Sequence, residues 1–76
     1  MTKAFKAVIP ATGWDDRYTF SPAVRAGNLL FISGMTASDP KGRLVGENDI
    51  VRQTEYIFEK MAAVLAAAGA NFSHVV

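Results

Sequence analysis

Residues 20–35 constrain the fold of this chain more than any other stretch, and they read FSPAVRAGNLLFISGM. Two short runs, 23–26 and 29–32, flank Gly27 and Asn28, and both of these residues tolerate a positive φ. Such a pair fits the primed turns that two-residue hairpins favour. The second run is apolar at every position, which is typical of a strand covered on both faces. The pattern therefore predicts a β-hairpin whose second strand is buried.

The second predicted strand ends on a small polar pair, Ser33 and Gly34. A hydroxyl and a glycine at this place expose backbone atoms and one side-chain oxygen, which suits a small ligand. The same pair also suits an ordinary strand end. The residues alone leave both interpretations open.

The size of the chain, 76 residues without cysteine, predicts one small domain that has no disulfide bonds. A domain of this size buries only about 60% of the surface of its unfolded chain. Yet 50% of the residues are hydrophobic. This apolar surplus predicts association with further copies or with a segment outside the chain. Residues 1–76 are interpreted as a single domain that is incomplete at its C-terminus, because Val75 and Val76 look like the start of another strand.

The charge of the chain is balanced, with a net value of +1 and a pI near 8.1, so neither a nucleic-acid nor a membrane partner is indicated. No apolar run approaches the ~18 residues of a membrane span, and the N-terminus lacks the apolar core of a signal peptide. We therefore expect a cytoplasmic protein. With one histidine and no cysteine, a metal site is not expected, and no cofactor-binding motif such as GxGxxG or a P-loop is present.

Two further strands are predicted, one on each side of the hairpin. Residues 3–9 are apolar at five of seven positions, and Pro10 ends this predicted strand because proline lacks the N–H group that a central strand needs. Residues 11–18 then read as a loop. After the hairpin, residues 39–42 read DPKG, which is a type I turn signal, and residues 43–45 are predicted to form a short returning strand.

Residues 49–68 are predicted to form an amphipathic helix. Asn48 or Asp49 would be its N-cap, and Gly69 would be the left-handed residue after its last turn. The side predicted to pack on the sheet carries, at 3.6-residue spacing, Ile50, Thr54, Ile57, Phe58, Met61, Val64, Leu65 and Ala68. The opposite side, predicted to face solvent, carries Arg52, Glu55, Glu59 and Lys60.

Four side chains outside the hairpin could have a functional role, and each has a simpler alternative. Trp14 could cap a pocket or seal a subunit interface, although packing is the commoner role of a tryptophan. Asp15 and Asp16 could bind a cation or transfer protons, but an adjacent pair is more often solvated surface. His74 could be a general base, yet no nucleophile or metal ligand lies near it in the sequence, which favours a loop or packing role.

A series of short motifs follows a fixed order in this chain. They are SPAV at 21–24, AGN at 26–28, FISG at 31–34, Gln53 with Thr54, the helix end at 66–69, and Val75 with Val76. In this order and at this spacing they resemble the reactive-intermediate deaminase family, which is also called the Rid, YjgF or endoribonuclease L-PSP family. The resemblance covers nearly the whole chain from residue 20 onward.

The resemblance implies an α+β fold akin to chorismate mutase, in which a mixed sheet is backed by packed helices. This chain would supply the first strands and the first helix. It also implies a homotrimer with ligand clefts between subunits. The implied activity is hydrolysis of 2-imino acids, or of their enamine tautomers, to 2-oxo acids with release of ammonia and without a cofactor. The arginine that would anchor the substrate carboxylate belongs to the second half of the family sequence, and no arginine of this chain matches it.

The resemblance places four residues of this chain in the substrate-binding cleft and leaves the catalytic residues unassigned. Ser33 and Gly34 match strand-end residues that line the cleft. Phe20 stands where many members have a tyrosine that contacts the ligand, and Met35 stands where a glutamine is frequent. Both departures make the cleft less polar. They favour a bulkier or more apolar substrate, such as the ring-cleavage enamines handled by aminomuconate deaminase-type relatives.

Two other functions stay open. Family members are also known as endoribonucleases and translation inhibitors, but this chain has no basic patch that would hold phosphates. The departures at Phe20 and Met35, together with the missing arginine, also fit a non-catalytic module that binds a small ligand or a protein partner.

Overall fold

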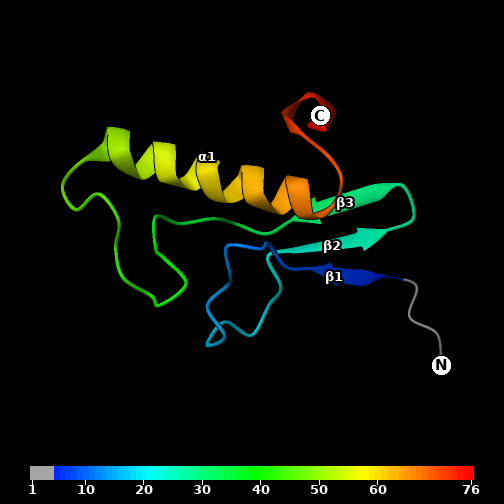
Figure 1. Cartoon of the computed structure of the whole chain (residues 1–76), viewed down its shortest axis with the longest axis horizontal. Coiled ribbons are helices and arrows are strands. Elements are labelled where there is room, and N and C mark those ends of the chain that lie inside the picture. Colours follow the sequence, from blue (N-terminus) through cyan, green and yellow to red (C-terminus); the bar gives the residue numbers. More distant parts are fainter. Residues whose placement is uncertain (1–4) are drawn as a thin grey trace.

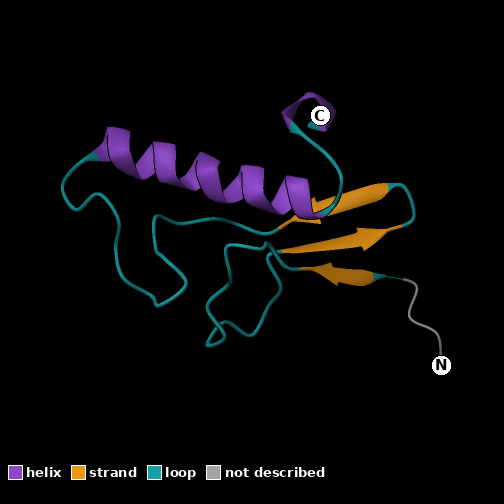
Figure 2. Ribbon diagram, in the orientation of Figure 1, coloured by secondary structure: helices purple, strands orange, loops and turns teal. Residues whose placement is uncertain are grey.

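The fold consists of a three-stranded antiparallel sheet and one long helix whose C-terminal end lies beside the sheet (Figure 1). The computed structural model describes residues 5–76. The sheet has the order β1-β2-β3, and the elements are β1 (Lys6–Val8), β2 (Ala23–Ala26), β3 (Leu29–Ile32), α1 (Ile50–Ala67) and the short 3₁₀ helix η1 (Phe72–His74). Figure 2 shows long loops before β2 and before α1. The predicted α+β class is confirmed.

The predicted hairpin is present, with Ala26 paired to Leu29 and Ala23 paired to Ile32. Gly27 has a φ of 59°, whereas Asn28 is not among the residues with positive φ. Only the first turn residue is therefore left-handed, which is the φ pattern of a type II′ turn. The right-handed twist that primed turns impose suits the two flanking strands.

The burial predicted for β3 on both faces is not found. Leu29 is 61% exposed and Phe31 is 58% exposed, while Leu30 and Ile32, which alternate with them, are half-buried. Successive side chains of a strand point to opposite faces, so one face of β3 is uncovered by residues 5–76. The prediction was wrong for this chain because no described segment packs against that face.

The strands predicted on each side of the hairpin are shorter than expected or absent. Strand β1 covers only Lys6–Val8, and the predicted positions 3 and 4 lie outside the described residues. The turn at 39–42 is confirmed, since the Gly42 N–H donates to the Asp39 carbonyl at 2.8 Å. The strand predicted at 43–45 is wrong, because the backbone there forms only a single bridge, Ser38 with Leu44.

The caps of α1 are as predicted, although the helix itself is one residue shorter at each end than the predicted 49–68. Asp49 is the N-cap, and its carboxylate accepts a hydrogen bond from the Arg52 N–H at 3.1 Å. Ala68 is the C-cap, and Gly69 follows with a φ of 74°. The left-handed conformation after the last turn, which glycine adopts without a steric cost, ends the helix. No helix among residues 5–76 has the length and apolar character of a membrane span.

The burial of side chains along α1 differs from the prediction. Val64 and Leu65 are buried as predicted, but Ile50, Thr54 and Phe58 are exposed. Figure 1 shows that the strands lie beside the C-terminal end of α1 and that the rest of the helix extends past the sheet, beside the loops. Periodicity identifies the apolar side of a helix, but it does not indicate how much of the helix length is covered by the sheet.

The segment after α1 forms a turn. Residues Phe72–His74 make the 3₁₀ helix η1, and the His74 Nδ1 atom accepts a hydrogen bond from the Asn71 N–H at 3.1 Å. His74 thus has the loop role that the sequence favoured. Val75 has extended backbone dihedral angles, but neither it nor Val76 pairs with a strand within the described residues.

The N-cap of α1 gives a direct test of this part of the fold. Replacement of Asp49 by alanine leaves the Arg52 N–H without its acceptor, and we expect a loss of about 1 kcal/mol in the free energy of unfolding. Urea unfolding followed by circular dichroism measures the loss. Glu47→Ala is the matched control, an exposed acidic residue two positions earlier. Equal stability of the two variants would contradict the capping role of Asp49.

Candidate functional site

The end of strand β3 is tied to the segment that leads into β2. The Ser33 N–H donates to the Pro22 carbonyl at 3.0 Å, and the Ser33 hydroxyl donates to the Ser21 carbonyl at 2.6 Å. Ser33 is half-buried, and the Pro22 side chain beside it is fully buried. Two hydrogen bonds from one residue fix both its backbone and its hydroxyl. The predicted strand-end serine is therefore held in one orientation.

The other three residues predicted for the cleft lie close to this point in the sequence, with different surroundings. Phe20 is 48% exposed; its ring stacks on Tyr18 with a centroid distance of 5.1 Å, and its carbonyl accepts a hydrogen bond from Trp14 Nε1 at 3.1 Å. Gly34 is exposed, and a Cβ added there would meet no atom within 4 Å. Met35 is half-buried. The space in front of the strand end is therefore open.

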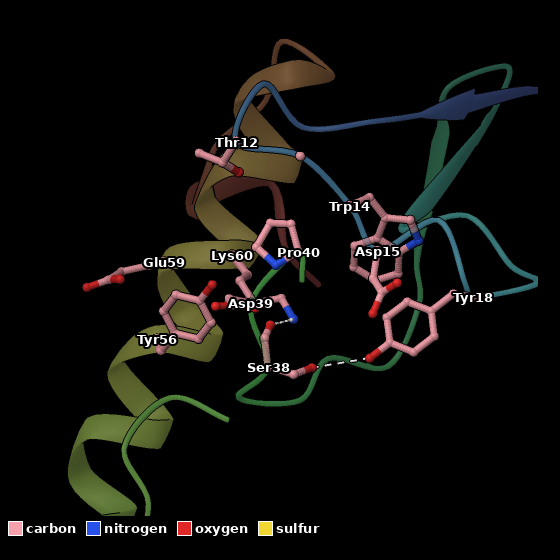
Figure 3. Close-up of a pocket in the computed structure, with 11 residues that line it drawn as sticks. Thr12, Trp14, Asp15, Tyr18, Ser38, Asp39, Pro40, Tyr56, Glu59 and Lys60 are labelled. Atoms are coloured by element: carbon pink, nitrogen blue, oxygen red, sulfur yellow. Dashed lines mark hydrogen bonds between the residues drawn. The ribbon is translucent and has the colours of Figure 1, made fainter. Parts of the chain in front are cut away.

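A separate pocket of about 140 Å³ lies between the loop before β2, the turn after β3 and helix α1 (Figure 3). Its walls are residues 12–15, Tyr18, residues 38–40, Tyr56, Glu59 and Lys60. None of the four residues predicted for the cleft lines it. Of the side chains that do, the sequence had suggested a pocket role for Trp14 alone.

Asp15 is buried in this pocket wall, at 6% exposure, and not solvated as predicted. Its carboxylate accepts two hydrogen bonds from the Arg17 guanidinium, at 3.0 and 2.7 Å, and a third from the Arg17 N–H at 3.0 Å. These hydrogen bonds lower the pKa of Asp15 to about 2. A carboxylate so acidic does not exchange protons near neutral pH, so Asp15 is a structural group. Asp16 beside it is exposed.

Lys60 was predicted to face solvent, but its ammonium group lies at the pocket. It donates hydrogen bonds to the Thr36 carbonyl at 2.8 Å and to the Ser38 carbonyl at 2.9 Å. It also lies 5.5 Å from the centroid of the Trp14 ring. Burial lowers the pKa of Lys60 below its ordinary value. The loop after β3 folds back over the polar side of α1, which periodicity does not reveal.

Tyr18 forms the edge of the same pocket. Its hydroxyl lies 3.2 Å from Ser38 Oγ, and this hydrogen bond lowers the pKa of Tyr18. Figure 3 shows Tyr18 and Trp14 on one side of the pocket and Tyr56 on the other. Three aromatic rings and the Lys60 cation thus contribute to the walls of the pocket.

All four arginines of the chain have protein partners. Arg25 donates to the Ala68 carbonyl, and the other three form ion pairs, which are Arg17 with Asp15, Arg43 with Asp39, and Arg52 with Glu59 and Glu55. Among residues 5–76, no three histidine, aspartate or glutamate side chains lie close enough together to hold a metal ion.

Residues 14–76 match the protein family described as Endoribonuclease L-PSP. Protein DfrA of Myxococcus xanthus is 42% identical over 59 residues, which are 78% of this chain and 45% of that protein. Reactive Intermediate Deaminase A, chloroplastic, of Arabidopsis thaliana is 40% identical over 58 residues, which are 75% of this chain and 30% of that protein. The crystal structure of YyfA from Yersinia pestis, a protein of unknown function of the conserved Rid family, superposes with a TM-score of 0.80 at 30% identity. That superposition covers 91% of this chain and 55% of YyfA. The chain spans less than half the length of these two curated relatives.

The pairing of Asp15 with Arg17 predicts a stability change at acid pH. Because the pKa of Asp15 falls from 3.8 to about 2 on folding, its ionised form stabilises the fold above pH 3.8, and this contribution is lost as the pH falls through about 2. Asp15→Asn removes it. We expect the difference in melting temperature between the natural protein and this variant to be constant above about pH 5 and to shrink between about pH 4 and pH 2.

The control for that measurement is Asp16→Asn, which changes the exposed neighbour in the same way. Thermal unfolding of the three proteins from pH 2 to pH 7 gives the comparison. A difference between natural protein and Asp15→Asn that persists unchanged to pH 2 would show that the ion pair does not stabilise the fold.

Proposed function

The chain belongs to the endoribonuclease L-PSP family, the family of the Rid and YjgF proteins, and on this basis we propose that it hydrolyses reactive 2-imino acids or their enamine tautomers. The products are a 2-oxo acid and ammonia. The similarity to a protein named Reactive Intermediate Deaminase A supports this reaction. The structural observation that carries the proposal is the fixed hydroxyl of Ser33 at the open end of β3.

The role of Ser33 follows from its hydrogen bond. Its only hydroxyl proton is donated to the Ser21 carbonyl, so the oxygen lone pairs remain as acceptors. They accept a hydrogen bond from the substrate iminium group or from the attacking water. In the reaction the water oxygen forms the new bond to carbon, the two protons of the water pass to the imine nitrogen, and the carbon–nitrogen bond breaks to release ammonia. Holding the attacking water in the productive orientation accounts for most of the rate enhancement that such a site can give.

The substrate carboxylate needs an anchor, and a planar guanidinium suits it because it binds both oxygens. The four arginines of this chain are engaged in the contacts described above. We therefore assign the anchor to the part of the family domain that residues 1–76 do not include. In this proposal residues 1–76 are the first half of a single Rid-type domain.

The assembly that we propose is a cytoplasmic homotrimer with clefts between its subunits. The exposed apolar face of β3, which carries Leu29 and Phe31, supports association with further copies. The open space at Gly34 supports a cleft at the strand end that a second subunit would close.

An alternative activity is cleavage of RNA, which the name of the matching family suggests. The charge of the chain disfavours it, because the net charge is +1 and three of the four arginines are neutralised by carboxylates. Binding of single-stranded RNA with an affinity that falls steeply as salt is added would favour this alternative over imine hydrolysis.

Replacement of Ser33 by alanine tests the catalytic proposal. We expect kcat for imine hydrolysis to fall about 100-fold, because an oriented hydrogen-bonding group at the reacting centre is lost. Release of 2-oxo acid from an imine generated in the assay measures the rate. Ser73→Ala is the matched control, since its hydroxyl is also bonded to a neighbouring residue, Asn71, but lies in η1. Unchanged turnover by Ser33→Ala would favour the non-catalytic binding module.

The substrate preference gives a second test. Because Phe20 lacks a phenolic hydroxyl and Met35 lacks an amide, we expect the natural protein to favour large or apolar imines over the smallest ones. The variant Phe20→Tyr adds one hydrogen bond and should raise kcat/KM for the smallest imino acid roughly 3- to 10-fold. A panel of imines of increasing size measures both effects, with Phe72→Tyr as the control for an added hydroxyl elsewhere. Turnover of only the smallest imine by the natural protein would refute the proposed preference.

A further inference from the structure

The pocket between the loops and α1 has features that the proposed reaction does not use. Its aromatic rings come from two distant segments, Trp14 and Tyr18 from the loop before β2 and Tyr56 from α1 (Figure 3). The Lys60 ammonium group lies 5.5 Å from the centroid of the Trp14 ring and 5.8 Å from that of Tyr56. A cation is therefore held between two aromatic faces at the wall of the pocket.

The carboxylates that line the pocket are neutralised from outside it. Each is paired with an arginine that is not part of the wall: Asp15 with Arg17 at 2.7 Å, Asp39 with Arg43 at 3.3 Å, and Glu59 with Arg52 at 3.1 Å. Lys60 is different, because none of the ion pairs among residues 5–76 involves it. The one charge of the pocket wall that forms no ion pair within the described chain is therefore positive.

The Lys60 ammonium group also keeps a free donor. An ammonium group has three N–H donors. Two are used by the carbonyl oxygens of Thr36 and Ser38, at 2.8 and 2.9 Å. The third donor and the unpaired charge together suit one oxygen of an anion. A carboxylate supplies such an oxygen, and a hydrogen bond between two charged groups is stronger than one between neutral groups.

The size and the walls of the pocket define the rest of the ligand. Its volume of about 140 Å³ is close to the roughly 150 Å³ of a cavity that holds one benzene ring. Aromatic walls favour a flat apolar body that stacks on them or meets them edge to face. We propose that this pocket is a second binding site, which takes a small planar monocarboxylate with its ring against the aromatic walls and its carboxylate on Lys60. This site shares no lining residue with the predicted cleft at Ser33 and goes beyond the proposed reaction.

Trp14 provides the readout for a test, since it is the only tryptophan in this sequence. The full-length natural protein is titrated with benzoate, with its neutral analogue benzamide and with the cation benzylamine, and tryptophan fluorescence is followed. We expect saturable binding of benzoate, at least about tenfold tighter than that of the other two probes. A Trp14→Phe variant identifies the part of the signal that comes from this pocket.

The variant Lys60→Gln removes the charge and keeps a donor for the loop carbonyls. We expect it to weaken benzoate binding at least about tenfold and to leave benzamide binding unchanged. Lys41→Gln is the matched control, because Lys41 is an exposed lysine next to the pocket wall whose side chain does not line it. Equal affinity for benzoate and benzamide, or equal affinity of Lys60→Gln and the natural protein for benzoate, would overturn the proposal.

A second measurement does not depend on the folding of any variant. Backbone amide resonances of the natural protein are recorded during a benzoate titration. Shifts centred on Ser38, Tyr56 and Lys60 are expected. Shifts confined to Ser33 and Gly34 would mean that benzoate binds only at the predicted cleft, and the second site would be rejected.

Discussion

The ammonium group of Lys60 joins three parts of the chain that are far apart in sequence. It projects from α1, donates to backbone carbonyls of the loop after β3, and lies over the Trp14 ring of the loop before β2. Loop carbonyls that are not in a ladder need a donor from elsewhere, and here the helix supplies it. The strand ladders link β1, β2 and β3 only, so the position of α1 against the loops depends on side-chain contacts of this kind. The shape of the pocket depends on the same group.

The parts of the fold that the sequence predicted well are those whose partners are close in the chain. Gly27 and the paired runs beside it specify the hairpin, and Asp49 and Gly69 specify the ends of α1, each through a local conformational or hydrogen-bonding preference. Lys60 was placed in solvent because helical periodicity separates apolar from polar sides and contains no information on a loop that returns over the polar side. In the same way, the apolar run of β3 predicts that both faces of the strand are buried, but it does not identify the segment or subunit that packs against the second face.

The two candidate sites also differ in how far they depend on local sequence. Ser33 could be singled out because a hydroxyl and a glycine directly follow an apolar strand, and its role came from the family resemblance. The second pocket could not be predicted, because its walls come from two loops and a helix whose contacts are long-range. Asp15 illustrates the difficulty. Its partner Arg17 is only two residues away, but the guanidinium fits there because Gly42 has no side chain; an added Cβ would lie 1.7 Å from Arg17 Nη2.

The position of β3 has a consequence for how this polypeptide behaves in solution. It is an outer strand of the sheet within residues 5–76, so its free side presents unpaired N–H and C=O groups. Natural sheets protect such edges with lysine, proline or a bulge, yet the residues from Leu29 to Ile32 include no charge and no proline. An exposed apolar strand edge without such protection can pair with the edge of another chain. An uncharged edge of this kind is a predicted site of aggregation for as long as it stays unpaired.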